Sequence, residues 1–270
     1  MNKKRIMQKR TTFLQKAAYI LRPFVVYMVV KTAAMLTLAI LLPSLPIAGI
    51  SVWVEEHSRM LSAVVNAAAS LAGVSFLLRD FLKEASVSGE VDIDAGVLKQ
   101  LLDFFKNSFL GLKSFGFCVL CAVFGVVSAF GLNALIGEAS DFLTRVSQTQ
   151  GTLGSQKYEA VKQIQYSVPL LGGLVLYGVI SPLVEEIVFR GVLFNRMKKF
   201  YSVGRAVVCS ALLFGAFHGN LPQFVYGTCM GVLIALCYEW TGCFYAPLLF
   251  HAAANVAVFS ELIRDGYFTR

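Results

Sequence analysis

Charge is scarce in this sequence. Only 15% of its 270 residues are Asp, Glu, Lys or Arg, whereas 57% are hydrophobic. Soluble domains carry about 25% charged and roughly 45–50% apolar residues, so the composition excludes a water-soluble globular protein. Intrinsic disorder is excluded as well, because disordered chains have low hydrophobicity. What remains is a multi-pass membrane protein in contact with the lipid bilayer.

The sequence also lacks the short alternating strands of a transmembrane barrel, so helices must satisfy the backbone groups within the membrane. A helical span needs about 20 apolar residues to cross hydrocarbon roughly 30 Å thick. We therefore predict an all-α transmembrane helix bundle with about seven spans, or six to eight because the fifth is short and Gly219–Pro222 separates it from the sixth. The apolar stretches are Phe24–Leu42, Met60–Leu78, Phe115–Leu135, Ser167–Val184, Ala206–Phe217, Leu221–Tyr238 and Phe244–Phe259.

The net charge of +8 would favour a nucleic-acid partner in a soluble chain. In a membrane protein, cations instead collect on the cytoplasmic side, so no nucleic-acid partner is expected. With a cytoplasmic N-terminus, 17 Lys and Arg residues fall in the cytoplasmic segments Lys3–Arg22, Arg79–Lys113 and Arg190–Arg205. Six fall on the opposite side, and Lys31 lies inside the first span. This imbalance predicts that the N-terminus is cytoplasmic.

No internal repeat divides the chain, which we interpret as one integral-membrane domain. Residues 1–166, an N-terminal cytoplasmic segment and three spans, carry no readable motif. They include an amphipathic or loop segment near Arg79–Lys113 and a polar outer loop near Glu138–Gln165. The six cysteines lie in or beside apolar spans, and the CxxC of Cys118 has no second pair. Small buried hydrophobic residues are therefore the better interpretation than metal or redox ligands.

Charged residues inside spans are rare and often functional. Glu186 and Arg190 are four residues apart, so they share a helix face and can form an ion pair. Glu185 is rotated by about 100° from Glu186 and is left without that partner. A carboxylate without a local cation in a low-dielectric site has its charged form disfavoured, which makes it a better base near neutral pH. The alternative is a solvated helix end.

Two further motifs place polar side chains on apolar helices. Phe214 and His218 share a face at four-residue spacing, as do His251 and Asn255. Each could simply form hydrogen bonds between helices. If the helix carrying Glu185 turns at Tyr201–Gly204, however, Glu185 and His218 lie about equally far from the turn and reach the same depth. Gly227 and Gly231 form a GxxxG pattern, which predicts close helix packing.

In this order along the chain, each on an apolar helix, EEIVFR, FGAFH and HAAAN resemble the motifs EExxxR, FxxxH and HxxxN. These motifs are typical of the CAAX-protease and bacteriocin-processing (CPBP) family, the intramembrane glutamic endopeptidases related to the Rce-type prenyl-protein protease. The resemblance implies a helix bundle with a catalytic cavity inside the membrane, formed by residues 167–270. It also implies the plasma membrane of a bacterium and a membrane-associated protein or peptide substrate.

By this resemblance, Glu185 activates the attacking water with help from His218, while His251 and Asn255 hold the oxyanion. No metal or other cofactor is implied. The residues with structural or supporting roles are Glu186, Arg190 and Phe214. Peptide hydrolysis needs a base, an acid and oxyanion donors, which these residue types supply. No serine or cysteine lies within the motifs, so direct attack by water is the natural mechanism.

Three alternatives stay open at this point. Two histidines and a glutamate form the ligand set of some catalytic zinc sites, although the HExxH spacing is absent. A non-proteolytic bacteriocin-immunity or partner-binding protein could retain the same motifs. A transporter could use the charges as a proton relay, but it would be expected to show an internal repeat. The substrate, whether a prenylated tail, a pheromone or bacteriocin precursor, or a membrane-anchored regulator, is not specified by the sequence.

Overall fold

The computed structural model describes residues 12–47, 49–85, 96–110, 115–147, 163 and 168–264, without the side chains of 107–110, 115, 137–147 and 261–264. These parts contain helices and turns and no strand, which confirms the all-α prediction. The basic segment 1–11 and residues 148–162 and 164–165 of the predicted outer loop lie outside the described residues.

The first helices form an antiparallel pair. α2 (Phe13–Ser44) begins with a capping box, in which Thr12 and Gln15 satisfy each other's backbone amides. It packs against α4 (Ser58–Ser75), and the short helix α3 (Ile50–Glu56) lies between them in the chain. His57 lies at the turn between α3 and α4 and stacks on Trp53.

α4 does not continue straight through its apolar stretch. It meets α5 (Leu78–Ala85) at a bend of 60°. α6 (Val97–Leu110) follows, so the segment predicted as amphipathic or loop contains two helices in the described residues. α7 (Phe115–Ser147) runs past the predicted span end at Leu135, so the first part of the predicted outer loop is helical.

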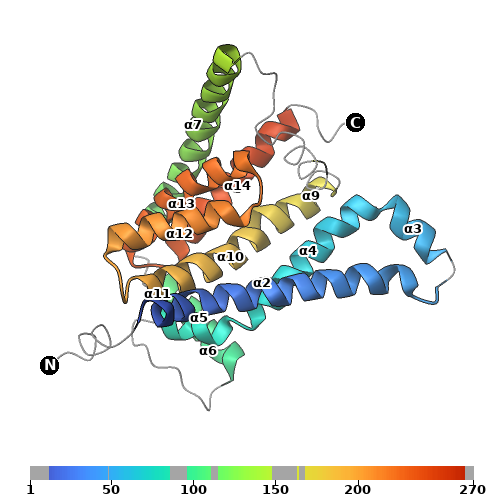
Figure 1. The fold of residues 1–270 in the computed structure, drawn as a ribbon, viewed down its shortest axis with the longest axis horizontal. Helices are drawn as coiled ribbons and strands as arrows, with labels where there is room; N and C mark the ends of the chain where they lie inside the picture. The colour runs from blue at the N-terminus through green and yellow to red at the C-terminus, as the bar shows by residue number, and fades with distance from the viewer. Residues whose placement is uncertain are drawn as a thin grey trace.

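A central helix occupies the middle of the molecule (Figure 1). It runs continuously from Leu170 to Met197 through α9 (Leu170–Gly173), η1 (Leu174–Ile180), α10 (Ser181–Glu186), η2 (Ile187–Phe194) and α11 (Asn195–Met197). The segments η1 and η2 are π-helical, a rare geometry that is frequent at functional sites. The helix contacts α2, α4 and α5 on the N-terminal side of the sequence and the later helices α12, α13 and α14.

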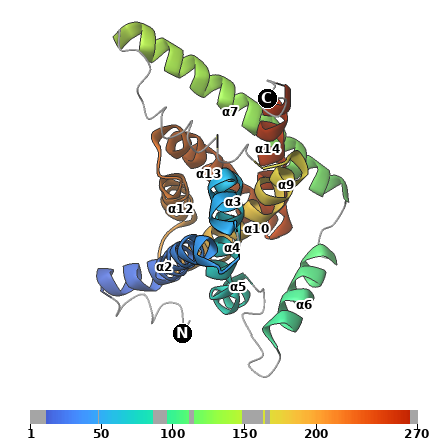
Figure 2. The ribbon, with the colours of Figure 1, turned by 90° about the vertical axis from the view of Figure 1, so that its right-hand side faces the viewer.

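The C-terminal helices form two close pairs, visible in Figures 1 and 2. α12 (Val203–Phe217) packs on α13 (Leu221–Thr241), and α14 (Tyr245–Arg264) packs on α7. Gly219, at φ 70°, allows the sharp break between α12 and α13, and Asn220 then caps α13 by accepting from the Gln223 amide. The predicted GxxxG packing is present, because Gly227 and Gly231 lie against the backbone of α12.

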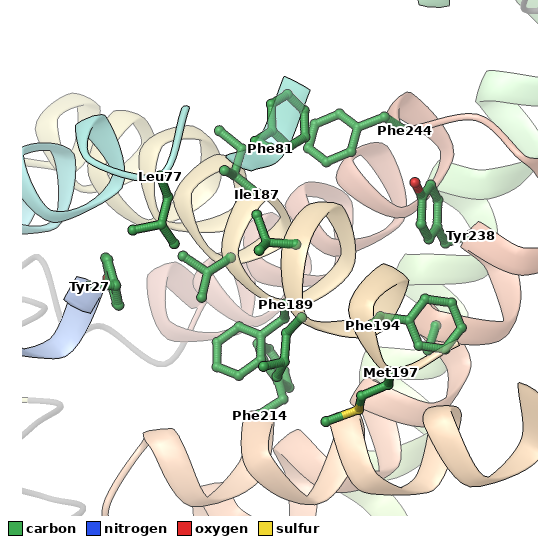
Figure 3. Packing of buried hydrophobic residues seen from close by; sticks show 14 of the residues in the cluster. Tyr27, Leu77, Phe81, Ile187, Phe189, Phe194, Met197, Phe214, Tyr238 and Phe244 are labelled. Atoms are coloured by element: carbon green, nitrogen blue, oxygen red, sulfur yellow. The ribbon is translucent and has the colours of Figure 1, made fainter. Parts of the chain in front are cut away.

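Apolar and aromatic side chains from both halves meet around the central helix (Figure 3). Tyr27 of α2, Phe81 of α5, Phe189 of η2 and Phe214 of α12 belong to one buried cluster. The rings of Phe189 and Phe214 pack edge to face with centroids 5.1 Å apart. The N-terminal helices, which carry no motif of their own, therefore cover the helix that carries the motifs.

A polar network joins the same two halves at one end of the bundle. Glu84 of α5, with 2% of its side chain exposed, contacts Lys199 Nζ at 2.5 Å and Arg196 Nε at 3.3 Å. It also accepts a hydrogen bond from the Tyr19 hydroxyl of α2 at 2.9 Å. Burial by itself would lower the pKa of Lys199, but the hydrogen bonds to Glu84 and Tyr19 outweigh it and raise that pKa. Residues from all three predicted cytoplasmic segments thus lie at one end of the molecule.

The seven predicted apolar stretches each coincide with a helix or with a consecutive helix pair. By length and composition, however, four described helices can cross a membrane, or five if the bent pair of α4 and α5 is one span. The difference arises because α4 bends and because α12 and the segment Tyr245–Ser260 of α14 are shorter than a membrane span. The six cysteines are free thiols, and the sulfurs of Cys121 and Cys237 lie 4.0 Å apart. Within the protein Cys121 is buried, as predicted for a small hydrophobic residue, whereas Cys209 and Cys229 are exposed on the helix bundle.

Candidate active site

The central helix brings four polar side chains together. Ser181, Glu185 and Glu186 belong to α10, and Arg190 belongs to η2. Ser181 and Glu185 are four residues apart, as are Glu186 and Arg190, so each pair shares one face of the helix. Both glutamates and the arginine are buried, Glu186 completely.

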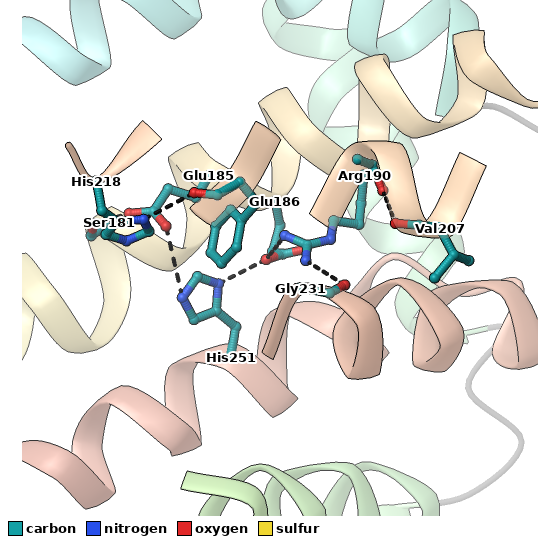
Figure 4. A network of polar contacts seen from close by, with 10 residues as sticks. Ser181, Glu185, Glu186, Arg190, Val207, His218, Gly231 and His251 are labelled. Atoms are coloured by element: carbon teal, nitrogen blue, oxygen red, sulfur yellow. Dashed lines mark hydrogen bonds and ion pairs between the residues drawn. The ribbon is translucent and has the colours of Figure 1, made fainter. Parts of the chain in front are cut away.

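Glu186 and Arg190 form the predicted ion pair, with Nη1 donating to Oε1 at 2.9 Å. Arg190 Nη2 donates to the Gly231 carbonyl of α13 at 3.1 Å. The Nδ1 atom of His251, on α14, lies 2.7 Å from the same Glu186 oxygen (Figure 4). Glu186 therefore tethers the central helix to α14, while Arg190 tethers it to α13.

Glu185 has a different environment from Glu186. Ser181 Oγ donates to its Oε1 at 2.5 Å, so it has a local partner, although a neutral one. Its Oε2 is buried and has no hydrogen-bond partner among the described residues. This oxygen faces His251 Nε2 at 3.8 Å, which is too long for a direct hydrogen bond. The ring of His251 thus lies between the two glutamates, hydrogen-bonded to one and turned towards the other.

The ring of Phe214 packs against both His218 and His251. It packs edge to face on His218, with centroids 5.2 Å apart, and on His251 at 5.6 Å. Arg190 lies over the same ring, 4.6 Å from its centroid. His218 Nδ1 lies 2.9 Å from the Phe214 carbonyl oxygen, which fixes the imidazole at the end of α12. In Figure 4, His218 lies at the same end of the site as Ser181 and Glu185. That Glu185 and His218 lie at the same depth in the membrane stays a prediction.

Asn255 follows His251 by one helical turn, as predicted, and also faces the central helix. Its Nδ2 donates to the carbonyl oxygen of Tyr177, in η1, at 2.9 Å. An amide nitrogen carries two hydrogens, so the second remains available to another acceptor. The structure therefore brings His251 to the glutamates and Asn255 to the π-helical segment that precedes them.

Sequence reasoning missed three partners in this site. Ser181 could have been found, because it precedes Glu185 by one helical turn and carries a hydroxyl donor. The carbonyls of Tyr177 and Gly231 could not, since every residue has a carbonyl and only the tertiary packing selects these two.

The described residues contain no set of three or more His, Cys, Asp or Glu side chains arranged to hold a metal ion. In the candidate active site, Glu186 contacts the imidazole of His251 and the guanidinium of Arg190. Both contacts are made by the same oxygen, Oε1.

Comparison with known proteins agrees with the location of this site. Residues 167–257 match the model of the Rce1-like family, which is described as "Type II CAAX prenyl endopeptidase Rce1-like". Over 202 residues, the chain is 23% identical to a Bacillus subtilis protein named "Putative membrane peptidase YdiL". The aligned region covers 75% of this chain and 71% of that protein. No solved structure matches. The matched segment contains all the side chains of the candidate active site, from Ser181 to Asn255.

Proposed function

We propose that this chain cleaves membrane-associated proteins or peptides with water activated by Glu185, because residues 167–257 match the Rce1-like family of CAAX prenyl endopeptidases and the chain is similar to a protein named as a membrane peptidase. One observation carries the proposal. Glu185 is buried, and Ser181 fixes one of its oxygens. The other oxygen faces His251 and receives no hydrogen bond from the residues that the structure describes. A fixed carboxylate with a free acceptor oxygen is what a general base requires.

In the proposed reaction, the free Oε2 of Glu185 binds the attacking water. Glu185 takes a proton as the water oxygen bonds to the scissile carbonyl carbon, which gives a tetrahedral intermediate with a negative oxygen. The C–N bond then breaks, and the same proton passes to the departing amine. His218, half-buried and held through Phe214, assists by hydrogen-bonding the water.

His251 and Asn255 are the proposed oxyanion donors. Glu186 engages Nδ1 of His251, so that Nε2 is the ring nitrogen turned towards Glu185. Donation from Nε2 to an oxyanion while Nδ1 also donates requires both ring nitrogens to carry a proton. Asn255 would contribute its second amide hydrogen. Fixed donors of this kind stabilise the transition state because they need no reorganisation during the reaction.

The Glu186–Arg190 pair supports a metal-independent reaction. A zinc ion bound to Glu186 would displace the contacts that its Oε1 makes with Arg190 and His251 Nδ1, so a zinc site here would have to use Glu185 Oε2 and His251 Nε2 instead. The guanidinium of Arg190 would also repel a divalent cation bound to Glu186. We therefore propose a glutamic peptidase without a metal or cofactor.

The proposed setting follows from the family and the charge distribution. We propose that residues 167–270 form the catalytic core, against which α2, α4, α5 and α7 pack. We propose a bacterial plasma membrane, a cytoplasmic N-terminus, and a CAAX-type tail or a leader or bacteriocin-type precursor as substrate.

The proposal is tested by comparing membranes that contain wild-type protein, Glu185→Gln, and the exposed control Glu55→Gln. Proteomics should find C-terminal or leader fragments with wild type and control that are missing with Glu185→Gln, together with accumulated precursor. A bacteriocin-immunity or binding role would survive Glu185→Gln. If the fragments and any immunity phenotype are unchanged in Glu185→Gln, the protein does not act through proteolysis by Glu185.

A further inference from the structure

Lys31 is a cation in the middle of a membrane span. It lies seven residues after Phe24 and eleven before Leu42, the ends of the first apolar stretch. At about 1.5 Å per residue these intervals are roughly 10 and 16 Å. Both exceed the length of its four-carbon stem, so the ammonium group lies within the apolar layer rather than at its surface. Such residues are costly and usually mark a functional site.

The neighbours of Lys31 connect it to the proposed active site. Its Nζ lies 5.0 Å from the ring centroid of Phe217 and 5.9 Å from that of Tyr27. Phe217 in turn packs edge to face on His218, with centroids 5.8 Å apart. Tyr27 is 1% exposed and also contacts Phe217, which fixes the turn of α2 that carries Lys31. One aromatic ring therefore separates the ammonium group from the imidazole.

The close contacts that the structure gives for the Lys31 ammonium group are with the rings of Phe217 and Tyr27. No ion pair joins it to a carboxylate in the part of the chain that the structure describes. The carboxylate of Glu185 interacts with it only at longer range. A cation–π contact is worth about 0.5–2 kcal/mol, which is small compared with the cost of removing an ammonium group from water. The surroundings of the Lys31 ammonium group would therefore favour the binding of an anion.

Resting on the function proposed above, we propose that Lys31 binds a carboxylate of the substrate and so positions the scissile bond at Glu185 and His218. Carboxylate is the chemistry that fits, because a substrate anion approaching Glu185 is repelled unless a cation offsets that charge. The carboxylate can be the free C-terminus of the peptide or an acidic side chain close to the cleaved bond. Lys31 is then a specificity-determining residue, supplied by the half of the chain that carries no family motif.

The test uses a fluorescence-quenched CAAX-type peptide with a farnesylated cysteine, cleaved by purified protein in nanodiscs. The peptide is made as a free acid, as a C-terminal amide, and with its acidic side chains replaced by their amides. A charge-assisted hydrogen bond in this environment predicts that Lys31→Met raises KM for the free acid by about 10–100-fold, with kcat within about twofold. The peptide that lacks the recognised carboxylate should show the same loss with wild type, and no further loss with Lys31→Met.

Two variants control for structural effects. Lys31→Arg keeps the charge and should restore most of the lost KM. Lys16→Met removes another half-buried cation of α2, which lies 6.0 Å from the Phe200 ring, and should leave both constants unchanged. Equal losses on all peptides, a fall in kcat alone, or a KM effect that follows the anionic lipid content of the nanodisc would each overturn the proposal. If wild type cleaves none of these peptides, the CAAX-type substrate of the proposed function fails together with this inference; if wild type cleaves them and Lys31→Met matches it, only this inference fails.

Discussion

Among single residues, His251 has the most informative position, because its two ring nitrogens face two different glutamates. Nδ1 is 2.7 Å from Glu186 and Nε2 is 3.8 Å from Glu185. The first contact orients the ring and the second leaves room for a reacting group. Glutamates that are adjacent in the sequence thus have different environments, since Glu186 is held by Arg190 whereas Glu185 has a neutral serine partner.

We predict that Arg190→Ala destabilises the protein by about 3–5 kcal/mol, because it leaves the buried carboxylate of Glu186 without its cation. The Gly231 carbonyl and the Phe214 ring lose their contacts with the guanidinium as well. Thermal unfolding followed by size-exclusion chromatography in detergent measures the effect, with the exposed Arg205→Ala as control. An Arg190→Ala protein that keeps its melting temperature and is merely inactive would indicate a direct chemical role instead.

Ser181→Ala should slow turnover while leaving stability nearly unchanged. Its hydroxyl fixes Glu185 Oε1, and loss of one such hydrogen bond is worth about 0.5–1.5 kcal/mol, or roughly 2–13-fold in kcat. Ser181→Thr retains the hydroxyl and should recover most of the rate in the same cleavage assay. If Ser181→Ala and wild type have equal kcat, Glu185 does not depend on this contact.

At the scale of helices, the site depends on how closely α14 approaches its neighbours, since α14 carries both His251 and Asn255. α14 is held on one side by the central helix and on the other by α7. Gly125 of α7 lies directly against the backbone of Phe250, the residue before His251, where a Cβ would collide with the Phe250 carbonyl. Packing at this point therefore sets the position of the α14 face that carries His251 and Asn255.

Gly125→Ala should thus lower stability by about 1–3 kcal/mol, the usual cost of overpacking, and should reduce activity by displacing His251. Gly131→Ala, on the same helix, is the matched control, because nothing lies within 4 Å of a Cβ added there. Melting temperatures and cleavage rates of the two variants are compared. Equal behaviour of the two would mean that α7 does not pack on α14 in the way described.

The whole molecule has basic and acidic residues from distant segments gathered at one end, where Glu84 joins α2, α5 and the end of α11. With the excess of Lys and Arg in these segments, this predicts that this end is cytoplasmic. In a cysteine-free background, Arg205→Cys should react with a membrane-impermeant maleimide only after the cells are opened, whereas Arg59→Cys should react in intact cells. The reverse pattern would show that the protein is inserted in the opposite orientation.

Much of this arrangement could be predicted from the sequence, because its determinants are local. The four-residue spacings of Glu186 with Arg190 and of His251 with Asn255 predict shared helix faces, and the apolar stretches predict the helices. The choice of Glu186 rather than Glu185 as the close partner of His251 could not be predicted, because it depends on the register between α10 and α14. The bend between α4 and α5 was also missed, since it occurs within a continuous apolar run.

The central claim is that Glu185 hydrolyses peptide bonds without a metal, and the most direct measurement is the cleavage rate of purified protein with and without 1,10-phenanthroline. The account predicts an unchanged wild-type rate in the chelator and a background rate for Glu185→Ala. Asn255→Ala should retain measurable activity, about 10²–10³-fold below wild type, because it removes only one oxyanion donor. Loss of wild-type activity in the chelator with recovery on adding zinc, or full activity in Glu185→Ala, would contradict the account.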